Sequence, residues 1–234
     1  MDEIKRLDAL LASSGFTVAI TGAGISSAAG IGVMGTLNMA DAMKVRSTTV
    51  LRATPKSYYA AAWRAFLEPM FTTGPTLAHD ALARLEQQGR VRGVVTTNLD
   101  CLHSLAGSRD VAEIQGSFGV NKCLKCERRY DDVQIWNQGR APRCLDCGGA
   151  IAPFPSYSNI GLLREDVDRG NQWLSQAELV LVIGTNGPYG MAYFDHINRG
   201  AQIIQINPQS TQFDHIAALN IKQPADVVFG RLSI

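Results

Sequence analysis

Four of the five cysteines fall into two Cys-x-x-Cys pairs that are separated by 17 residues. The four are Cys123, Cys126, Cys144 and Cys147. Two pairs at this spacing are typical of a closed tetrahedral zinc site, in which four thiolates leave no position for water or substrate. The spacing therefore predicts a structural zinc ion rather than a catalytic one. The alternative is four unrelated buried thiols, which the paired spacing disfavours.

A glycine-rich stretch, TGAGISSAAGI at residues 21–31, directly follows an apolar segment. Gly22 and Gly24 would let the backbone turn tightly and approach a pyrophosphate, whose charge is favoured at a helix N-terminus. Ser27 stands where the usual G-x-G-x-x-G pattern has its third glycine, and no acidic residue closes a second strand about 20 residues further on. The stretch by itself fits a dinucleotide site and a plain strand-to-helix turn equally well.

Polar side chains follow other apolar segments in the same way. The stretch VVTTNLDCLH presents Asn98, Asp100 and His103 where a strand would end, and strand ends form the ligand crevice of open α/β sheets. An Asx turn capped by Asp100 explains the same residues, and His103 alone is more typical of a packing or helix-surface residue. Residues 180–190 and 203–211 also end in small polar groups, which suit nucleotide hydroxyls and phosphates or ordinary loops.

Gln115 occupies another place where catalytic side chains occur, between a short apolar run and Gly116. An amide has little proton affinity, so this side chain can hydrogen-bond a hydroxyl group but cannot take its proton. The position is therefore suited to chemistry, while the residue type is not suited to general-base catalysis.

The segments that must position these residues are short, β-branched and nearly continuously apolar, as in parallel strands buried on both faces. Helical patterns alternate with them and end at glycines, at residues 4–15 and 79–89. This alternation predicts an α/β fold with a Rossmann-like, doubly wound parallel sheet. The expected strands are residues 16–21, 91–97, 111–115, 178–185, 201–207 and 226–230.

Two irregular regions interrupt this rhythm. We expect residues 119–154 to form a small zinc-binding module and residues 32–73 to form a flexible or helical cofactor-loop excursion, whose part up to residue 56 could act as a lid. The remaining residues, 1–31, 74–118 and 155–234, would form the Rossmann-like domain.

Composition excludes several classes of partner. The net charge is +1 and 18% of residues are charged, so there is no basic field for nucleic acid or anionic lipid. No apolar run approaches the roughly 20 residues that a membrane helix needs. The N-terminus carries Asp2 and Glu3 and lacks the apolar core of a signal peptide. We therefore expect a cytoplasmic protein with neither nucleic-acid nor membrane partners.

Together these stretches resemble the sirtuin family, in order, from residue 17 to about residue 211. The resemblance implies a Rossmann-type domain, a small zinc domain, NAD as co-substrate in the cleft between them, and cleavage of the nicotinamide–ribose bond. The matching stretches are GAGISSAAGI, GPTLAHDALARLE, TTNLDCLH, EIQGSFGVNKCLKC, CLDCGGAIAP, VIGTNG and INPQST.

The resemblance also implies roles for single residues. The phosphate turn would be Gly22, Ala23, Gly24 and Ser26. Asn98 and Asp100 would hold the nicotinamide ribose and carboxamide. The other NAD contacts would be Met34, Thr97, Gly184, Thr185, Asn186 and Asn207, and the zinc ligands Cys123, Cys126, Cys144 and Cys147.

Four departures from the family pattern bear on function. Gln115 stands where the family has the histidine that acts as general base. Met34 replaces a phenylalanine that shields the reacting sugar, and the neighbouring Asp and Arg are missing. Thr97 replaces a glutamine and Asn186 a serine. Residues 153–161 read PFPSYSNIG in place of the Phe-Gly-Glu stretch that pairs with acyl-lysine peptides.

These departures set the functional expectation. Breaking the nicotinamide bond needs orientation and charge stabilisation, which Asn98 and Asp100 could supply with Gln115 as a hydrogen-bonding partner. We therefore expect an NAD-consuming transferase that moves ADP-ribose to a protein or small-molecule acceptor. The alternatives are an NAD-dependent lysine deacylase, in which His103 or His79 would have to act as base, an NAD hydrolase, and an NAD-binding sensor with little turnover.

Overall fold

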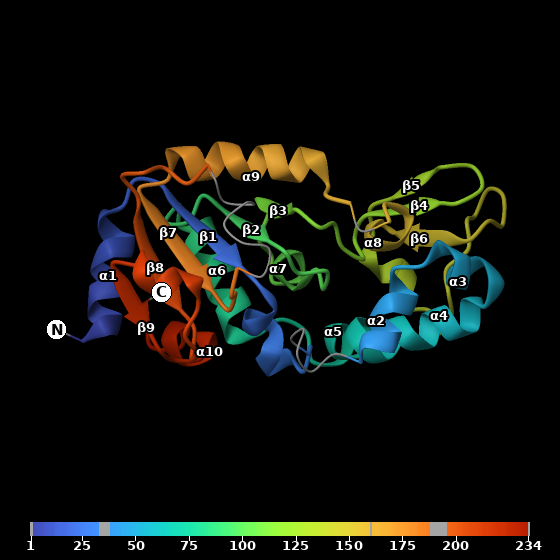
Figure 1. Ribbon diagram of the computed structural model, residues 1–234, viewed down its shortest axis with the longest axis horizontal. Helices are drawn as coiled ribbons and strands as arrows, with labels where there is room; N and C mark the ends of the chain where they lie inside the picture. The colour runs from blue at the N-terminus through green and yellow to red at the C-terminus, as the bar shows by residue number, and fades with distance from the viewer. Residues whose placement is uncertain (1, 33–37, 160, 188–195, 234) are drawn as a thin grey trace.

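The computed structural model describes residues 2–32, 38–159, 161–187 and 196–233. A six-stranded sheet with the order β3-β2-β1-β7-β8-β9 forms its larger part (Figure 1). Every neighbouring pair runs parallel, which confirms the predicted fold class. The strands are β1 (Thr17–Thr21), β2 (Gly93–Thr96), β3 (Val111–Glu113), β7 (Leu179–Ile183), β8 (Gln202–Ile206) and β9 (Leu219–Ile221).

Helices cover both faces of this sheet. Ala19 of β1 packs in a cluster with residues of α1 (Glu3–Ser13), α6 (Leu77–Gln87) and α10 (Ala225–Phe229). Val18 and Ile20, which point the other way, pack with Trp173 of α9 (Arg164–Gln176). The helices on both faces bury β1 at all five positions. This burial explains why the strand lacks the apolar–polar alternation of a half-exposed strand.

The free edge of β3 is covered by side chains of α9. Asp166 accepts a hydrogen bond from the Glu113 backbone N–H, and Arg169 donates one to the Val111 carbonyl. These two side chains replace a further strand at the sheet edge, where unpaired backbone groups would otherwise be exposed. They also hold the end of β3 in place, just before Gln115.

The second part of the molecule combines a small sheet with a group of short helices (Figure 1). The sheet pairs β4 (Asn121–Cys123) antiparallel with β5 (Arg129–Tyr130) and β6 (Ile151–Pro153). The helical group comprises α2 (Met39–Val45), α3 (Thr48–Ala53), α4 (Pro55–Ala62), the π-helical turn Trp63–Leu67 and α5 (Glu68–Thr72). Two further elements complete this part, the 3-10 turn Val133–Trp136 and α8 (Phe154–Tyr157).

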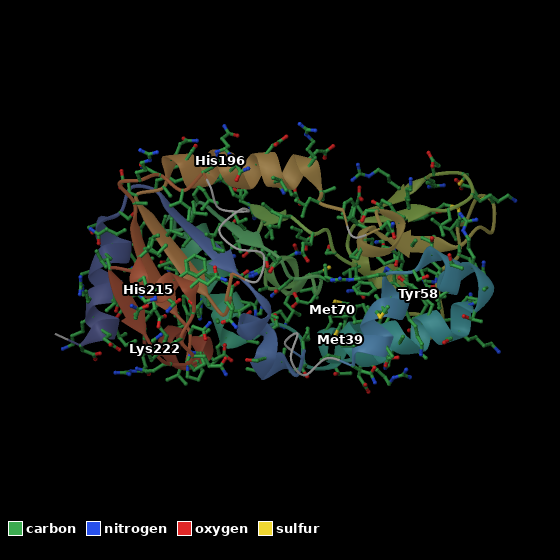
Figure 2. All side chains as sticks on the ribbon, in the orientation of Figure 1. Met39, Tyr58, Met70, His196, His215 and Lys222 are labelled. Carbon is green, nitrogen blue, oxygen red and sulfur yellow. The ribbon has the colours of Figure 1, made fainter. Side chains whose placement is uncertain are left out.

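These helices share a core with the small sheet. Tyr58 and Met70 lie in this second part of the molecule (Figure 2). They belong to one buried cluster with Phe118 and Trp136. The Trp136 indole N–H donates to the Asn121 side chain at 2.9 Å. The described part of the expected excursion is therefore helical and packed against the zinc module. The residue bounds given to the three units above stay a prediction.

One expected strand is wrong. Residues 226–230 were expected to be a strand, but Ala225–Phe229 form helix α10. Pro224 directly precedes the helix as its N-cap residue. The buried residues Ala225, Val228 and Phe229 recur at helical spacing. The sixth strand is instead β9, which has only three residues and no strong apolar pattern.

No helix among the described residues is long and apolar enough to cross a membrane.

Candidate active site

The glycine turn after β1 packs against the turn after β7. The Gly24 N–H donates to the Gly184 carbonyl at 2.8 Å, and a Cβ on Gly24 would lie 2.8 Å from the same oxygen. Gly184 itself has a φ of +59°, a conformation that favours glycine. Both positions therefore require glycine, because the two backbones touch. β1 lies between β2 and β7, so this contact marks the switch point where open α/β sheets bind ligands.

A hydrogen-bonded cluster lies beside this turn. The Asn98 amide donates to the Gly22 carbonyl and to the Ser26 hydroxyl, each at 3.2 Å. The Ser26 hydroxyl donates to Asp100 Oδ2 at 2.7 Å, and the Leu102 N–H donates to Asp100 Oδ1 at 3.1 Å. These hydrogen bonds thus join the predicted site residues Asn98 and Asp100 to the glycine turn, through its residues Gly22 and Ser26.

Asp100 is buried, which raises the pKa of its carboxyl group, while the bonds from Ser26 and Leu102 act in the opposite direction. Both carboxyl oxygens accept hydrogen bonds, an arrangement that suits an ionised carboxylate. A carboxylate and an amide at the carboxyl end of β2 can stabilise positive charge and orient hydroxyl groups on a bound nucleotide.

The turns after β7 and β8 are joined in a similar way. The Asn207 amide donates to the Thr185 carbonyl at 3.3 Å, and both residues are buried. The Thr185 hydroxyl accepts from the Gly187 N–H at 3.2 Å. Asn186 is exposed, and Thr97 after β2 is half-buried.

The predicted contact Met34 lies outside the described residues. Ala23 is half-buried at the start of the 3-10 turn Ala23–Ala29. NAD contacts at these positions and at those above therefore stay predictions.

Gln115 lies in the turn after β3 and is half-buried. Its side-chain amide has no hydrogen-bond partner among the described residues, so no bond joins it to Asn98 or Asp100. The next residue, Gly116, has a φ of +64°, and a Cβ there would lie 2.2 Å from the Phe154 ring. The turn that carries Gln115 therefore packs directly on α8, the segment that leaves the zinc module.

The two histidines considered as alternative bases are both buried. His79 is 0% exposed and His103 is 2% exposed. Burial lowers the pKa of His79 to about 4, and burial together with the neighbouring His79 lowers the pKa of His103. Because neither ring is accessible to solvent, neither is exposed as a general base would need to be to reach a bound ligand.

Sequence reasoning missed Glu113, which ends β3 two residues before Gln115. Its carboxylate accepts a hydrogen bond from the Ser117 hydroxyl at 2.6 Å. Burial, with smaller contributions from the Asp166 and Asp100 charges, raises its pKa to about 7. A carboxylate at the end of a strand beside the expected crevice was the only signal in the sequence.

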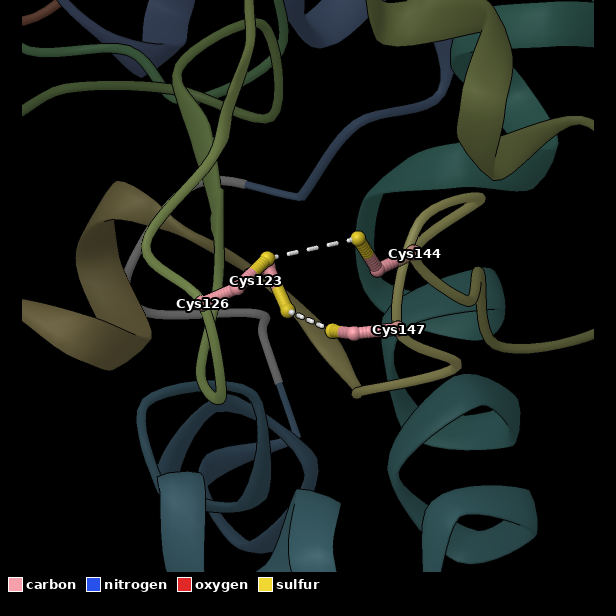
Figure 3. Close-up of side chains that lie close together, drawn as sticks. All are labelled: Cys123, Cys126, Cys144 and Cys147. Atoms are coloured by element: carbon pink, nitrogen blue, oxygen red, sulfur yellow. Dashed lines mark hydrogen bonds between the residues drawn. The ribbon is translucent and has the colours of Figure 1, made fainter.

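The four paired cysteines come together as the spacing predicted (Figure 3). The sulfur atoms of Cys123 and Cys147 are 3.5 Å apart and those of Cys126 and Cys144 are 3.6 Å apart. All four lie within 4.8 Å of one another. Zn–S bonds of about 2.3 Å in a tetrahedron place sulfurs about 3.8 Å apart, so the cluster fits a structural zinc ion. Cys101 is buried elsewhere and is not part of the cluster.

Residues 22–188 match the model of the Sir2 family. The chain belongs to the Sir2 family. The match covers the glycine turn, the Asn98 and Asp100 cluster and all four zinc-site cysteines. It follows that this Sir2-family protein is an NAD-dependent enzyme, and that its cysteine cluster is consistent with structural zinc.

Relatives of this Sir2-family protein are similar along almost the whole chain. An NAD-dependent protein deacetylase of Pyrobaculum aerophilum is 31% identical over 99% of this chain and 94% of its own length. An NAD-dependent protein deacylase of the same organism is 34% identical over 95% of this chain and 92% of its own length. An NAD-dependent protein deacetylase of Sulfurisphaera tokodaii is 32% identical over 94% of this chain and 91% of its own length.

Solved sirtuin structures share the fold. A structure from work on sirtuin substrate affinity is 30% identical, has a TM-score of 0.84 and covers 98% of this chain and 97% of that chain. A complex of Sir2 with a p53 peptide and NAD+ is 30% identical and has a TM-score of 0.79. The match covers 97% of this chain and 96% of that chain. A histidine-to-alanine variant of Sir2 with deacetylated p53 peptide and 3′-O-acetyl ADP-ribose is 28% identical with a TM-score of 0.75, again covering 97% and 96%.

Proposed function

We propose that this protein is an NAD-dependent protein deacylase, the activity named for its full-length relatives. The observation that carries the proposal is the Ser26, Asn98 and Asp100 cluster at the switch point of the sheet. This reverses the order of preference drawn from the sequence alone, in which ADP-ribosyl transfer came first. The reason is that relatives similar over nine-tenths of their length are named as deacetylases and deacylases.

The first chemical step needs little acid–base help. When the nicotinamide–ribose bond breaks, nicotinamide leaves as a neutral molecule with the bonding electron pair, and the ribose carbon becomes oxocarbenium-like. A buried Asp100 carboxylate that is already hydrogen-bonded can stabilise this positive charge without reorganising. Asn98 would orient the ribose beside it. An acyl-lysine oxygen would then attack the ribose carbon.

The second step is where we infer a departure from the family pattern. In the family a histidine removes a ribose hydroxyl proton so that the acyl group can pass to the sugar. We propose that Gln115 occupies that position, where it can orient the hydroxyl but not take its proton. A positioned base typically contributes about 10²–10⁴-fold. Acyl transfer should therefore be slow relative to nicotinamide release.

Mass spectrometry of the products formed from NAD and an acetyl-lysine peptide tests the proposal. Acetylated ADP-ribose together with the free lysine peptide is the expected result. Free ADP-ribose with the peptide unchanged would show hydrolysis instead and would rule out deacylation of that peptide. Asp100→Asn serves as the matched control, because it keeps the shape of the side chain but removes the charge, and it should abolish nicotinamide release.

ADP-ribosyl transfer is the second candidate, and two observations favour it. Gln115 supplies no base. In addition, residues 154–157 form helix α8, and Pro155 lacks an N–H, in the stretch that replaces the family's peptide-pairing Phe-Gly-Glu segment. NAD labelled in its adenine ring distinguishes the two activities. Label bound covalently to an acceptor protein or small molecule supports transfer, whereas label found only in acetylated ADP-ribose excludes it for that acceptor.

A further inference from the structure

The turn that carries Gln115 is closed by Glu113 in two ways. The Gly116 N–H donates to the Glu113 carbonyl at 2.7 Å, which makes residues 113–116 a β-turn with Gln115 at its third position. The Ser117 hydroxyl donates to Glu113 Oε2 at 2.6 Å. This side-chain contact between Glu113 and Ser117, the clasp, closes a second ring around Gln115.

The donors and acceptors of the clasp fit a single arrangement of protons. Burial raises the pKa of Glu113 to about 7, so at pH 8 its carboxyl group is mostly ionised and can only accept. The one proton of the Ser117 hydroxyl therefore points to Glu113, while the Ser117 oxygen accepts from the Gly119 N–H at 3.0 Å. The length of the clasp is typical of a hydroxyl that donates to a carboxylate.

Two other segments hold the backbone just before Gln115. The Ile114 N–H donates to the Thr96 carbonyl of β2 at 3.1 Å, and the Ile114 carbonyl accepts from the Leu163 N–H, just before α9, at 2.9 Å. The backbone at Gln115 is thus fixed, while its side-chain amide has no hydrogen-bond partner among the described residues. A free side chain on a fixed backbone is what a residue needs if it must meet a ligand in one orientation.

We propose that Glu113 and Ser117 are positioning residues, whose clasp fixes the turn so that the side chain at position 115 meets the ribose in one orientation. The inference rests on the proposed function, in which Gln115 orients a ribose hydroxyl. Ser117 is 0% exposed, so it acts through the turn and not by contact with a ligand. The clasp should matter for acyl transfer, which depends on this orientation, and not for nicotinamide release.

Ser117→Ala and Ser108→Ala form a matched pair for the test. Both serines are buried, but the Ser108 hydroxyl has no partner among the described residues. Relaxation of ¹⁵N in the backbone amides at pH 8 measures the order of the turn without any substrate. In Ser117→Ala the order parameters of residues 114–116 should fall from about 0.85 toward about 0.6. They should stay at the wild-type values in Ser108→Ala, and also in Glu113→Gln, which keeps an acceptor oxygen for Ser117.

Gln115→His provides a probe of position, because proton transfer requires an imidazole within hydrogen-bond reach of the ribose hydroxyl. Added to this variant, Ser117→Ala should slow single-turnover acyl transfer roughly tenfold, the size expected for one lost hydrogen bond to a charged group. Ser108→Ala should leave that rate unchanged, and nicotinamide release should be equal in all the variants. A role of the clasp in stability alone would slow both steps equally or neither.

The two measurements separate failure of the inference from failure of the proposed function. Equal order of the turn in Ser117→Ala and Ser108→Ala would overturn the inference, and so would equal slowing of both chemical steps by Ser117→Ala. Neither result touches the proposed function. No gain of acyl transfer in Gln115→His would overturn the proposed role of this position and the orientation of the ribose with it, while relaxation would still show whether the clasp fixes the turn. Chemical denaturation confirms that each variant is folded.

Discussion

At the scale of single residues, the proposed mechanism assigns its two steps to different side chains. The Asn98 and Asp100 cluster would support nicotinamide release without a proton acceptor, because the leaving group is neutral. Passing an acyl group to the ribose needs a proton acceptor, and Gln115 cannot provide one. The balance between the two steps should therefore depend on this one side chain.

Gln115→His should raise the rate of acyl transfer from an acetyl-lysine peptide by at least about tenfold, because a positioned imidazole can take the hydroxyl proton. The rate of nicotinamide release should change little. Single-turnover experiments that follow nicotinamide and acetylated ADP-ribose separately measure both rates. Gln115→Asn is the control, since it keeps the amide. An unchanged acyl-transfer rate in Gln115→His would show that the position does not face the ribose.

Glu113 gives the protein a distinct dependence of stability on pH. Its pKa is raised in the folded state from 4.5 to about 7, mainly by burial. Between these values the folded protein binds a proton that the unfolded chain has lost. The stabilisation from this group is therefore complete below about pH 4.5 and is lost as the pH rises through 7. His79 acts in the opposite direction, since its lowered pKa removes stability as the pH falls from 6.5 to about 4.

Glu113→Gln removes the titrating group but keeps an oxygen for the Ser117 hydroxyl. Relative to the wild type, its free energy of unfolding should be higher at pH 8 by roughly 2 kcal/mol, and close to the wild-type value at pH 5. Urea denaturation at the two pH values gives this difference directly. Asp168→Asn is the comparison, because the Asp168 side chain is 70% exposed and its removal should change neither value. A Glu113→Gln variant less stable than the wild type at pH 8 would contradict the expectation.

At the scale of elements, the zinc cluster holds a module with little core of its own. Beyond the cysteines, Ile151 is the main buried residue beside the cluster. The larger core around Trp136 is shared with helices α2 to α5. A module of this kind depends on metal, because binding of structural zinc contributes directly to folding. Loss of zinc should therefore loosen the helices as well as the module.

Cys144→Ser should lower the zinc content from one ion per chain to nearly none and should increase the solvent exposure of Trp136. Metal analysis measures the first effect and tryptophan fluorescence the second. Cys101→Ser is the control, because Cys101 is buried but lies outside the cluster. Full zinc content in Cys144→Ser would rule out a four-cysteine site.

At the scale of the whole molecule, NAD binding and folding should be linked through the contact between the turns after β1 and β7. The contact joins segments about 160 residues apart, at the switch point of the sheet. A ligand that binds only the folded protein stabilises it by about 2.7 kcal/mol at 100 times its Kd. The stabilisation that NAD causes should therefore report whether the turn is intact.

Gly24→Ala should greatly reduce the rise in unfolding temperature caused by NAD, because its Cβ would lie 2.8 Å from the Gly184 carbonyl and must displace the turn. Thermal denaturation with and without NAD measures the shift independently of any change in basal stability. Gly200→Ala is the matched control, since its Cβ meets no atom closer than 3.6 Å. A full NAD shift in Gly24→Ala would show that this turn does not hold the co-substrate.

Much of this molecule follows from local patterns in its sequence. The cysteine spacing predicts the zinc cluster, because two Cys-x-x-Cys pairs can close one tetrahedron whatever surrounds them. Five of the six expected strands occur, because burial on both faces demands continuous apolar residues. The ordered motifs identify the family and the residues of the glycine turn. In each of these cases the prediction depends on residues that are close together in the sequence.

Other features were decided only by the tertiary structure. Residues 226–230 have a strand-like composition but form α10, because they pack their helical face on the sheet. Gly116 requires glycine because Phe154, 38 positions later in the sequence, lies against it. The lowered pKa values of His79 and His103 and the raised pKa of Glu113 arise from burial by distant segments. Desolvation and close approach depend on which residues meet in space, and the sequence states only their order.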